Sequence, residues 1–299
     1  MEKVLIELPN QYSLHDTLYP SFTYPFFEYN NKIVKVVGSF SGTVFYFKKS
    51  LMEIQFRDSI PSRFIKEWLG LWFDPSEFVG VLSSTDRRIA ETIVKTYRNI
   101  RLSVSTCDRD YIFVSVFLSQ NTDFHFNTVR WIRKLVSVYG PEFLKANPRF
   151  SIAGDSYQLK RLEKVFSTYK RIETCSDLGF LRMNLLSIKG VGPKTADAFI
   201  LFSSKNSEST PCDVHLKRFI GRLGLVDFKK LPSKNYCSKY YCWFDSECPV
   251  KEECLRYLFM NKFRKLSGWI QTIAYLHDKK FCSKSRCEEC SFRKLCKFI

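Results

Sequence analysis

The feature that most constrains the fold is a glycine turn between two short helical patterns. Apolar residues recur at helical spacing over residues 181–188. The turn at 189–193 ends that pattern, because Gly190 and Gly192 can take the positive φ angles of a sharp turn and Pro193 favours the first position of a new helix. The second helix then carries an apolar stripe that can pack back on the first, at Ala196, Phe199 and Ile200. The stretch therefore predicts a helical hairpin at 178–202.

A turn of this kind is expected to leave the backbone N–H groups of Gly190, Val191 and Gly192 open at the start of a helix. A phosphate oxygen binds well at such a position, so the turn is a candidate nucleic-acid contact. Such hairpins also occur in proteins that only hold DNA, and a glycine turn between packed helices can be purely structural. The turn alone leaves these interpretations open.

Lys194 lies in the first turn of the predicted second helix. The positive end of the helix dipole disfavours a lysine there, and a helix selected for stability alone would carry Asp or Glu. The same position, with partial burial, favours an amine that acts as a nucleophile toward a sugar C1′. Lys194 is therefore a candidate catalytic residue.

Asp213 follows a polar loop at 203–210. We expect its side chain to cap a helix that begins near Val214, because Asp accepts hydrogen bonds from the first N–H groups of a helix. Capping is compatible with a catalytic role, so the sequence leaves both functions open.

Residues 188–197 and 212–215 resemble the helix-hairpin-helix (HhH-GPD) DNA glycosylase superfamily, which includes endonuclease III and 8-oxoguanine glycosylase. The family pattern is a Leu-x-x-(Pro/Ile)-x-Gly-Val-Gly-x-Lys-x-Ala-(Asp/Asn) hairpin followed by Val-Asp-x-His. By this resemblance, Lys194 is the Schiff-base nucleophile of a bifunctional glycosylase and Asp213 is the essential carboxylate. Cys212 replaces the more usual valine, a small change that we do not expect to matter.

The charge of the chain agrees with an anionic partner. Its 299 residues carry a formal net charge of +17, which favours nucleic acid over a merely solvated basic surface. No apolar run is long enough for a membrane span, and the first residues do not form a signal peptide. We expect a monomer that acts on damaged double-stranded DNA, without a membrane partner. It would be intracellular, in the cytoplasm or nucleoid of a prokaryote, with an archaeon as one option.

The first part of the chain predicts a small antiparallel sheet. β-Branched and aromatic runs separated by turn residues indicate strands at 33–37, 43–47 and 51–56. Helical patterns follow at 62–73 and 86–100, and almost only helices come after them. This order is similar to the region ahead of the helical core in 8-oxoguanine glycosylase and in the alkyladenine glycosylase AlkA.

We therefore predict an α+β fold in three parts. Residues 1–105 form a sheet-containing domain with flanking helices, and residues 106–230 form the mainly helical glycosylase core with the hairpin and Asp213. Residues 231–299 form a C-terminal helical region with two cysteine groups, the second of them an iron-sulfur loop.

An apolar stretch at 111–118 predicts a buried helix, with Asp108 or Asp110 as its cap. The residues after it, 119–123, look like the Leu-Ser-x-Gln-x-Thr-Asp of endonuclease III. By that resemblance, Gln120 and Asn121 face the DNA and help fill the gap left by an extruded nucleotide. A plainer interpretation is that residues 121–123 cap the next helix.

Tyr157 lies in a break between helical segments where members of the family often carry a loop that wedges into the duplex. Its ring could stack on bases. It could equally pack on the protein surface.

Four cysteines near the C-terminus fall within fifteen residues, a density that suits a soft metal. They are Cys282, Cys287, Cys290 and Cys296. Their spacing is close to the loop of endonuclease III that holds a four-iron four-sulfur cluster, and the resemblance implies a 4Fe-4S cluster with a structural role. The family has six residues between the first two ligands and this chain has four, which puts Cys282 in doubt. Zinc is the alternative.

A second cysteine group is not required by the family pattern. It consists of Cys237, Cys242, Cys248 and Cys254. Its spacing fits a second metal, two disulfides or free thiols, and the sequence does not decide among them.

The expected reaction is base excision followed by strand cleavage, with no nucleotide cofactor. A non-catalytic hairpin protein that binds DNA is one competing hypothesis, but it gives no reason for Lys194 and Asp213 to occur together. A glycosylase without lyase activity is another, and it normally lacks the lysine. The N-terminal sheet favours oxidised purines such as 8-oxoguanine as substrates, whereas Gln120 and the cysteine loop favour oxidised pyrimidines.

Overall fold

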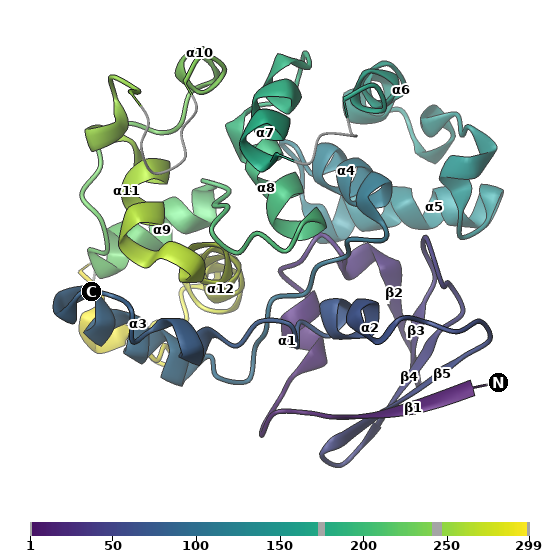
Figure 1. The fold of residues 1–299 in the computed structure, drawn as a ribbon, viewed down its shortest axis with the longest axis horizontal. Coiled ribbons are helices and arrows are strands. Elements are labelled where there is room, and N and C mark those ends of the chain that lie inside the picture. The colour runs from purple at the N-terminus through teal and green to yellow at the C-terminus, as the bar shows by residue number, and fades with distance from the viewer. Residues whose placement is uncertain (1, 173–176, 241–246, 298–299) are drawn as a thin grey trace. The chain divides into compact units, whose positions relative to one another are not determined.

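The structure, a computed structural model, describes residues 2–172, 177–240 and 247–297. The chain divides into two compact units, and each is assembled from separate stretches (Figure 1). The first unit comprises Met1–Trp72, Asn99–Thr168 and Phe202–Ser204. The second comprises Phe73–Arg98, Tyr169–Leu201 and Lys205–Ile299.

The first unit contains a five-stranded antiparallel sheet with the strand order β1-β5-β4-β3-β2. Its strands are β1 (Glu2–Glu7), β2 (Phe27–Tyr29), β3 (Ile33–Lys35), β4 (Val44–Lys48) and β5 (Leu51–Phe56). The three predicted strands correspond to β3, β4 and β5, so the α+β fold class is confirmed. Strands β1 and β2 extend the sheet at its two edges beyond the prediction.

Helices complete the first unit. They are α1 (Leu14–Leu18), α2 (Ser62–Trp68), α4 (Arg109–Leu118), α5 (Val129–Tyr139) and α6 (Tyr157–Tyr169), whose last residue is assigned to the second unit. Trp68 of α2 is fully buried and meets Phe45 of β4 edge to face at 6.4 Å, which packs this helix on the sheet. As predicted, α4 is buried over its apolar stretch.

Asp108 precedes α4 without capping it, contrary to one of the two options expected. Its carboxylate instead lies 3.0 Å from the Lys35 ammonium, and both side chains are fully buried. It also accepts the backbone N–H of Ser39 at 2.7 Å. A buried lysine needs a charged partner, and that demand takes the carboxylate away from the helix start.

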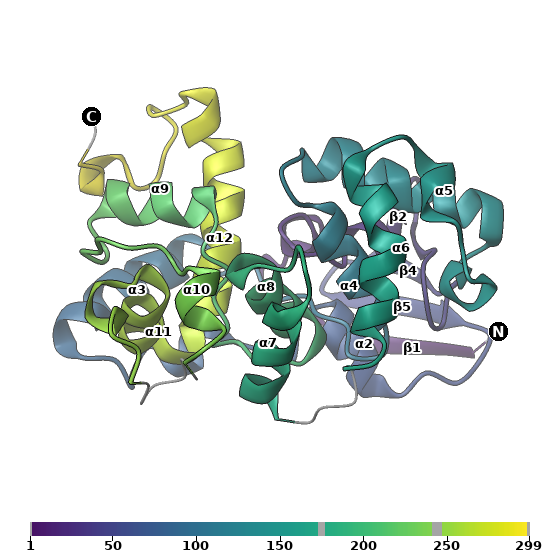
Figure 2. The same cartoon turned by 90° about the horizontal axis from the view of Figure 1, so that it is seen from above.

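The second unit is mainly helical. Its helices are α3 (Ser84–Thr96), α7 (Leu178–Ser187), most of α8 (Pro193–Ser203), α9 (Val214–Leu223), α10 (Lys234–Cys237), α11 (Leu255–Phe263) and α12 (Ser267–Lys280). Helix α9 lies beside α12 (Figure 2). Within the described ranges, none of the helices combines the length and apolarity that a membrane span requires.

The predicted hairpin is present as α7, a turn and α8. Asp177 caps α7 by accepting the Phe180 N–H at 2.6 Å, and Pro193 is the first residue of α8. Gly190 has a φ of 94°, as expected. The expectation of positive φ at Gly192 is wrong, since that residue is not among the positive-φ glycines. One left-handed residue is enough to reverse the chain here, and Gly192 leads directly into the helix.

The two turn glycines should respond differently to a methyl group. Gly190→Ala places a side chain in the left-handed region and should cost about 1 kcal/mol or more of unfolding free energy. Gly192→Ala should change it by less than about 0.5 kcal/mol, because no atom beyond its two chain neighbours lies within 4 Å of the position that its Cβ would take. Denaturant unfolding of both variants measures this difference. Equal destabilisation would contradict the assignment of the strained position to Gly190.

Candidate active site and cysteine pocket

Lys194 is the second residue of α8 and is half-buried. No hydrogen bond or ion pair to its side chain occurs among the residues that the structure describes. The amine therefore stands at the start of the helix without a protein partner there, as a nucleophile for an incoming ligand requires.

Asp213 is the N-cap of α9, which confirms the predicted capping role. One carboxylate oxygen, Oδ1, accepts the Leu216 N–H at 2.8 Å. The other, Oδ2, accepts a hydrogen bond from Gln271 Nε2 at 3.1 Å. Both oxygens are held, so the direction of the half-buried carboxylate is fixed by two separate helices.

Gln271 was not predicted as a site residue. It is 5% exposed on α12, in a run that is otherwise largely apolar. A buried amide among apolar residues needs hydrogen-bond partners, and this requirement was the only indication in the sequence that Gln271 contacts another polar group. It does not reveal that the partner is Asp213.

Asp278 of α12 attaches α9 to the same helix. Its Oδ2 lies 2.6 Å from His215 Nδ1 and 3.0 Å from Arg218 Nη1. Burial alone would raise the pKa of Asp278, but hydrogen bonds and charge from His215 and Arg218 lower it below its usual value. The helix that Asp213 caps is thus anchored to α12 through charged groups as well as through Gln271.

Asp197 joins the hairpin to the rest of the second unit. Its fully buried carboxylate lies 2.7 Å from Arg182 Nε on α7 and 2.9 Å from Arg256 Nε on α11. Although burial would raise the pKa of Asp197, the two guanidinium groups lower it. The Ser209 hydroxyl donates to the Asp197 carbonyl at 2.9 Å, so the loop that leads to Asp213 returns to α8 three residues after Lys194.

The hairpin turn is partly closed on itself. The Val191 N–H donates to the Ile188 carbonyl at 3.1 Å, and Val191 is 1% exposed. The expectation that this N–H is open to a ligand is therefore wrong, because the tight turn uses it internally. Gly190 and Gly192 are half-buried, and the space beside Gly192 is open.

Two segments of the first unit that were predicted to contact DNA meet each other. One follows α4, and the other is the start of α6, whose first residue is Tyr157, so Tyr157 does not lie in the predicted break between helices. Asn121 is exposed, with φ at 50°, and its Nδ2 donates to the Tyr157 hydroxyl at 3.2 Å. The Gln120 carbonyl accepts from Gln158 Nε2 at 2.8 Å. Asp123 caps the next helical segment through the Phe126 N–H at 2.9 Å, whereas Asn121 does not. Tyr157 is 47% exposed, so a polar and an aromatic side chain are presented together.

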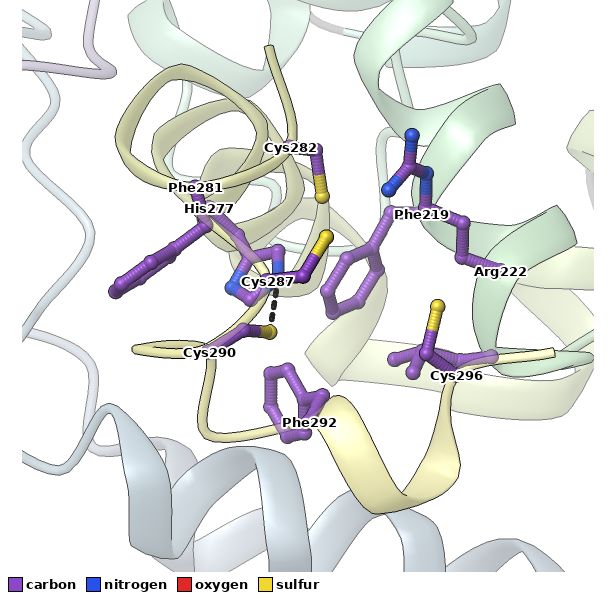
Figure 3. A pocket seen from close by; sticks show the side chains of 10 residues that line it. Phe219, Arg222, His277, Phe281, Cys282, Cys287, Cys290, Phe292 and Cys296 are labelled. Carbon is purple, nitrogen blue, oxygen red and sulfur yellow. Dashed lines mark hydrogen bonds between the residues drawn. The ribbon is translucent and has the colours of Figure 1, made fainter. Parts of the chain in front are cut away.

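The four C-terminal cysteines line one small pocket in the second unit (Figure 3). The rest of the lining comes from α9, α12 and the loop itself, namely Phe219, Arg222, Leu223, His277, Phe281 and Phe292. The Lys297 N–H donates to the Arg222 carbonyl at 2.7 Å and closes the end of the loop onto α9. Burial raises the pKa of the Cys282 and Cys290 thiols.

His277 contributes an imidazole ring to the lining of this pocket. Its Nε2 lies 3.4 Å from Cys290 Sγ (Figure 3). Its Nδ1 lies 2.5 Å from the Tyr97 hydroxyl. Burial lowers the pKa of His277 to about 4. Within the described ranges, no three His, Cys, Asp or Glu side chains stand close enough to hold one metal ion. The donor set, four thiols around a single hollow, is chemically suited to a soft polynuclear centre.

The second cysteine group is only partly within the described residues. Cys237, Cys248 and Cys254 are buried, and Cys242 lies outside the described ranges. Burial raises the pKa of the Cys237 thiol, while the neighbouring Arg182 guanidinium acts in the opposite direction. No disulfide joins Cys237, Cys248 and Cys254 to one another.

Two proteins of known name are similar in sequence to this chain. A protein of Methanocaldococcus jannaschii that bears the name of a DNA repair glycosylase is 30% identical over 136 residues, which are 45% of this chain and 54% of that protein. The N-glycosylase/DNA lyase of Saccharomyces cerevisiae is 29% identical over 105 residues, 34% of this chain and 28% of that protein. The matched region thus spans about half of one relative and about a quarter of the other. No family model matches the sequence.

Solved structures resemble the chain over nearly its whole length. The protein MBOgg1, solved with a low-affinity DNA ligand, has a TM-score of 0.69 at 19% identity, with 93% of this chain and 96% of that chain covered. The 8-oxoguanine glycosylase/lyase of Clostridium acetobutylicum, solved with double-stranded DNA that contains cytosine opposite 8-oxoguanine, has a TM-score of 0.67 at 14% identity, with 93% and 96% covered. The two sequence relatives are thus named as glycosylases, and the chain has the fold of these solved structures.

Proposed function

We propose that this protein is a bifunctional DNA glycosylase, which removes a damaged base and then cuts the strand at the resulting abasic site. The observation that carries the proposal is Lys194, an amine without a protein partner among the described residues, at the start of a hairpin helix. The oriented carboxylate of Asp213 belongs to the same unit. The names of the relatives and of the structural neighbours support the same activity.

We infer 8-oxoguanine as the favoured substrate. The five-stranded N-terminal sheet agrees with the 8-oxoguanine expectation, and a structural neighbour is named as an 8-oxoguanine glycosylase/lyase. Oxidised pyrimidines are the alternative. Single-lesion duplexes containing either kind of base separate the two by their rates of excision.

The proposed reaction begins when the damaged nucleotide leaves the base stack, because its C1′ is not accessible inside the duplex. The neutral Lys194 amine attacks C1′, the glycosidic bond breaks, and the departing base takes up a proton. The Asp213 carboxylate stabilises the positive charge that develops on the sugar. Gln271 holds that carboxylate in place. The Schiff base makes the C2′ proton acidic, and its loss expels the 3′ phosphate.

In this proposal the protein binds duplex DNA as a monomer inside a prokaryotic cell. Gly190 and Gly192 would face a backbone phosphate at the hairpin turn. Gln120 and Asn121 would help fill the gap in the duplex, and the Tyr157 ring would stack on a base.

We also propose that the four C-terminal cysteines hold a 4Fe-4S cluster. Such a cluster would supply a cross-link for the loop rather than a step of the reaction. The loop also carries the exposed basic residues Lys284, Arg286, Arg293 and Lys294, which would lie along phosphates.

Lys194→Gln should abolish the covalent protein–DNA adduct that borohydride traps on damaged or abasic duplex, because the imine cannot form without the amine. Lys217→Gln removes an exposed lysine of α9 and should still give the adduct. The yield of adduct on a denaturing gel measures both. Normal trapping by Lys194→Gln would mean that another group is the nucleophile.

Asp213→Asn removes the negative charge of this residue and keeps its role as the N-cap of α9. Asn is nearly as good an N-cap as Asp, so unfolding free energy and duplex affinity should change little. Single-turnover excision should fall by about a hundredfold or more, the scale of an electrostatic or acid-base group. Excision at the wild-type rate would leave Asp213 with a structural role alone.

Purified protein should be coloured and contain iron and sulfide. Cys287→Ser or Cys290→Ser should remove most of both, whereas Cys212→Ser, which lies outside the pocket, should not. Metal analysis and the visible absorption spectrum measure the result. Colourless protein with stoichiometric zinc would reject the cluster in favour of the alternative metal.

A further inference from the structure

The ammonium group of Lys234 sits on the hairpin turn. Its Nζ donates to the Ile188 carbonyl at 2.9 Å and to the Val191 carbonyl at 3.1 Å. Lys234 is half-buried at the start of the short helix α10, 43 and 46 residues along the chain from these two partners. A residue from a distant segment therefore completes a turn that otherwise looks local.

The two carbonyls are groups that the hairpin itself leaves without full partners. Ile188 is the C-cap of α7 and has extended backbone angles, and the last carbonyls of a helix have no intrahelical donor. Its oxygen already accepts the Val191 N–H, so the ammonium is a second donor to the same atom. A positive charge is also favourable at the negative end of the α7 dipole.

The charge of the Lys234 ammonium would affect the binding of an anion at the hairpin turn. Carbonyl oxygens that faced a phosphate would repel it, and a cation bound to them offsets that repulsion. The ammonium is within hydrogen-bond distance of the turn backbone, well inside the Debye length of about 8–10 Å at ordinary salt concentrations.

We propose that Lys234 is a DNA-binding residue that acts through the hairpin turn. It holds the Ile188 and Val191 carbonyls on the protein side and adds a fixed positive charge behind the Gly190–Gly192 backbone, where a phosphate of the duplex docks. This inference rests on the proposed function, because it presumes that the turn binds a phosphate. Its partner is the sugar-phosphate backbone, and neither the sequence nor the damage of the duplex is read.

The test compares Lys234→Met with Lys239→Met, a matched loss of charge at an exposed lysine five residues further on. Equilibrium binding to an undamaged duplex is measured over a series of salt concentrations, so that base excision does not enter. Lys234→Met should weaken binding several-fold and reduce the slope of log affinity against log salt by about 1. The loss should be equal on damaged duplex, and Lys239→Met should leave both quantities unchanged.

A second pair of variants separates charge from folding. Lys234→Gln keeps an N–H donor for the carbonyls but no charge, and Lys234→Arg keeps both. The inference requires Arg to bind like the wild type and Gln to bind like Met. It is overturned if the folded Gln and Arg variants have equal affinity and equal salt slope, since Lys234 would then only support the turn. A wild-type protein that binds no duplex would instead refute the proposed function, and this inference with it.

Discussion

The second unit depends on the buried carboxylate of Asp197. It pairs with Arg182 of α7 and Arg256 of α11, and all three side chains are at most 3% exposed. Burying a charge costs several kcal/mol unless its neighbours compensate, and removing one partner of such a pair costs about 3–5 kcal/mol. The helices that carry these residues consequently have one favourable arrangement. These buried ion pairs therefore hold α7 and α8, and the turn between them, in place.

The buried ion pairs of Asp197 also determine where Lys194 lies at the start of α8. Lys194 lies one turn before Asp197 on α8, so the same ion pairs that anchor the helix also set the position from which the amine projects. Ser209 ties the following loop to the Asp197 carbonyl, and Gln271 then orients Asp213. Groups held in this way need little reorganisation when a ligand arrives, which is the main contribution that a rigid scaffold makes to catalysis.

The parts that the sequence predicts well are those determined by local chemistry. Gly190 favours a turn and Pro193 favours the start of a helix through their own backbone preferences. Strands β4 and β5 are β-branched and aromatic runs of normal length. Strands β1 and β2 were not predicted, and they are identified only by their pairing with β5 and β3 at the two edges of the sheet. Which of two neighbouring glycines takes the positive φ is also not encoded locally, and the prediction for Gly192 was wrong for that reason.

Side chains that arrive from distant segments were missed for a different reason. Gln271 and Lys234 each carry an ordinary polar group, and no pattern around them names the carboxylate or the carbonyls that they meet. The hairpin and Asp213 were therefore predictable as parts of a site. The residues that hold them in place were not.

The second unit is built from stretches that lie far apart in the chain, so they leave the ribosome at different times. Helix α3 buries Ala90 and Ile93 fully, and Asp86 near its start pairs with Lys262 at 2.9 Å on α11. Tyr97, just past its end, meets His277 of α12. More than half of the chain is synthesised between α3 and these partners. A ribosome therefore releases α3 long before anything can cover its apolar face, and the nascent chain must remain protected from aggregation until α11 and α12 emerge.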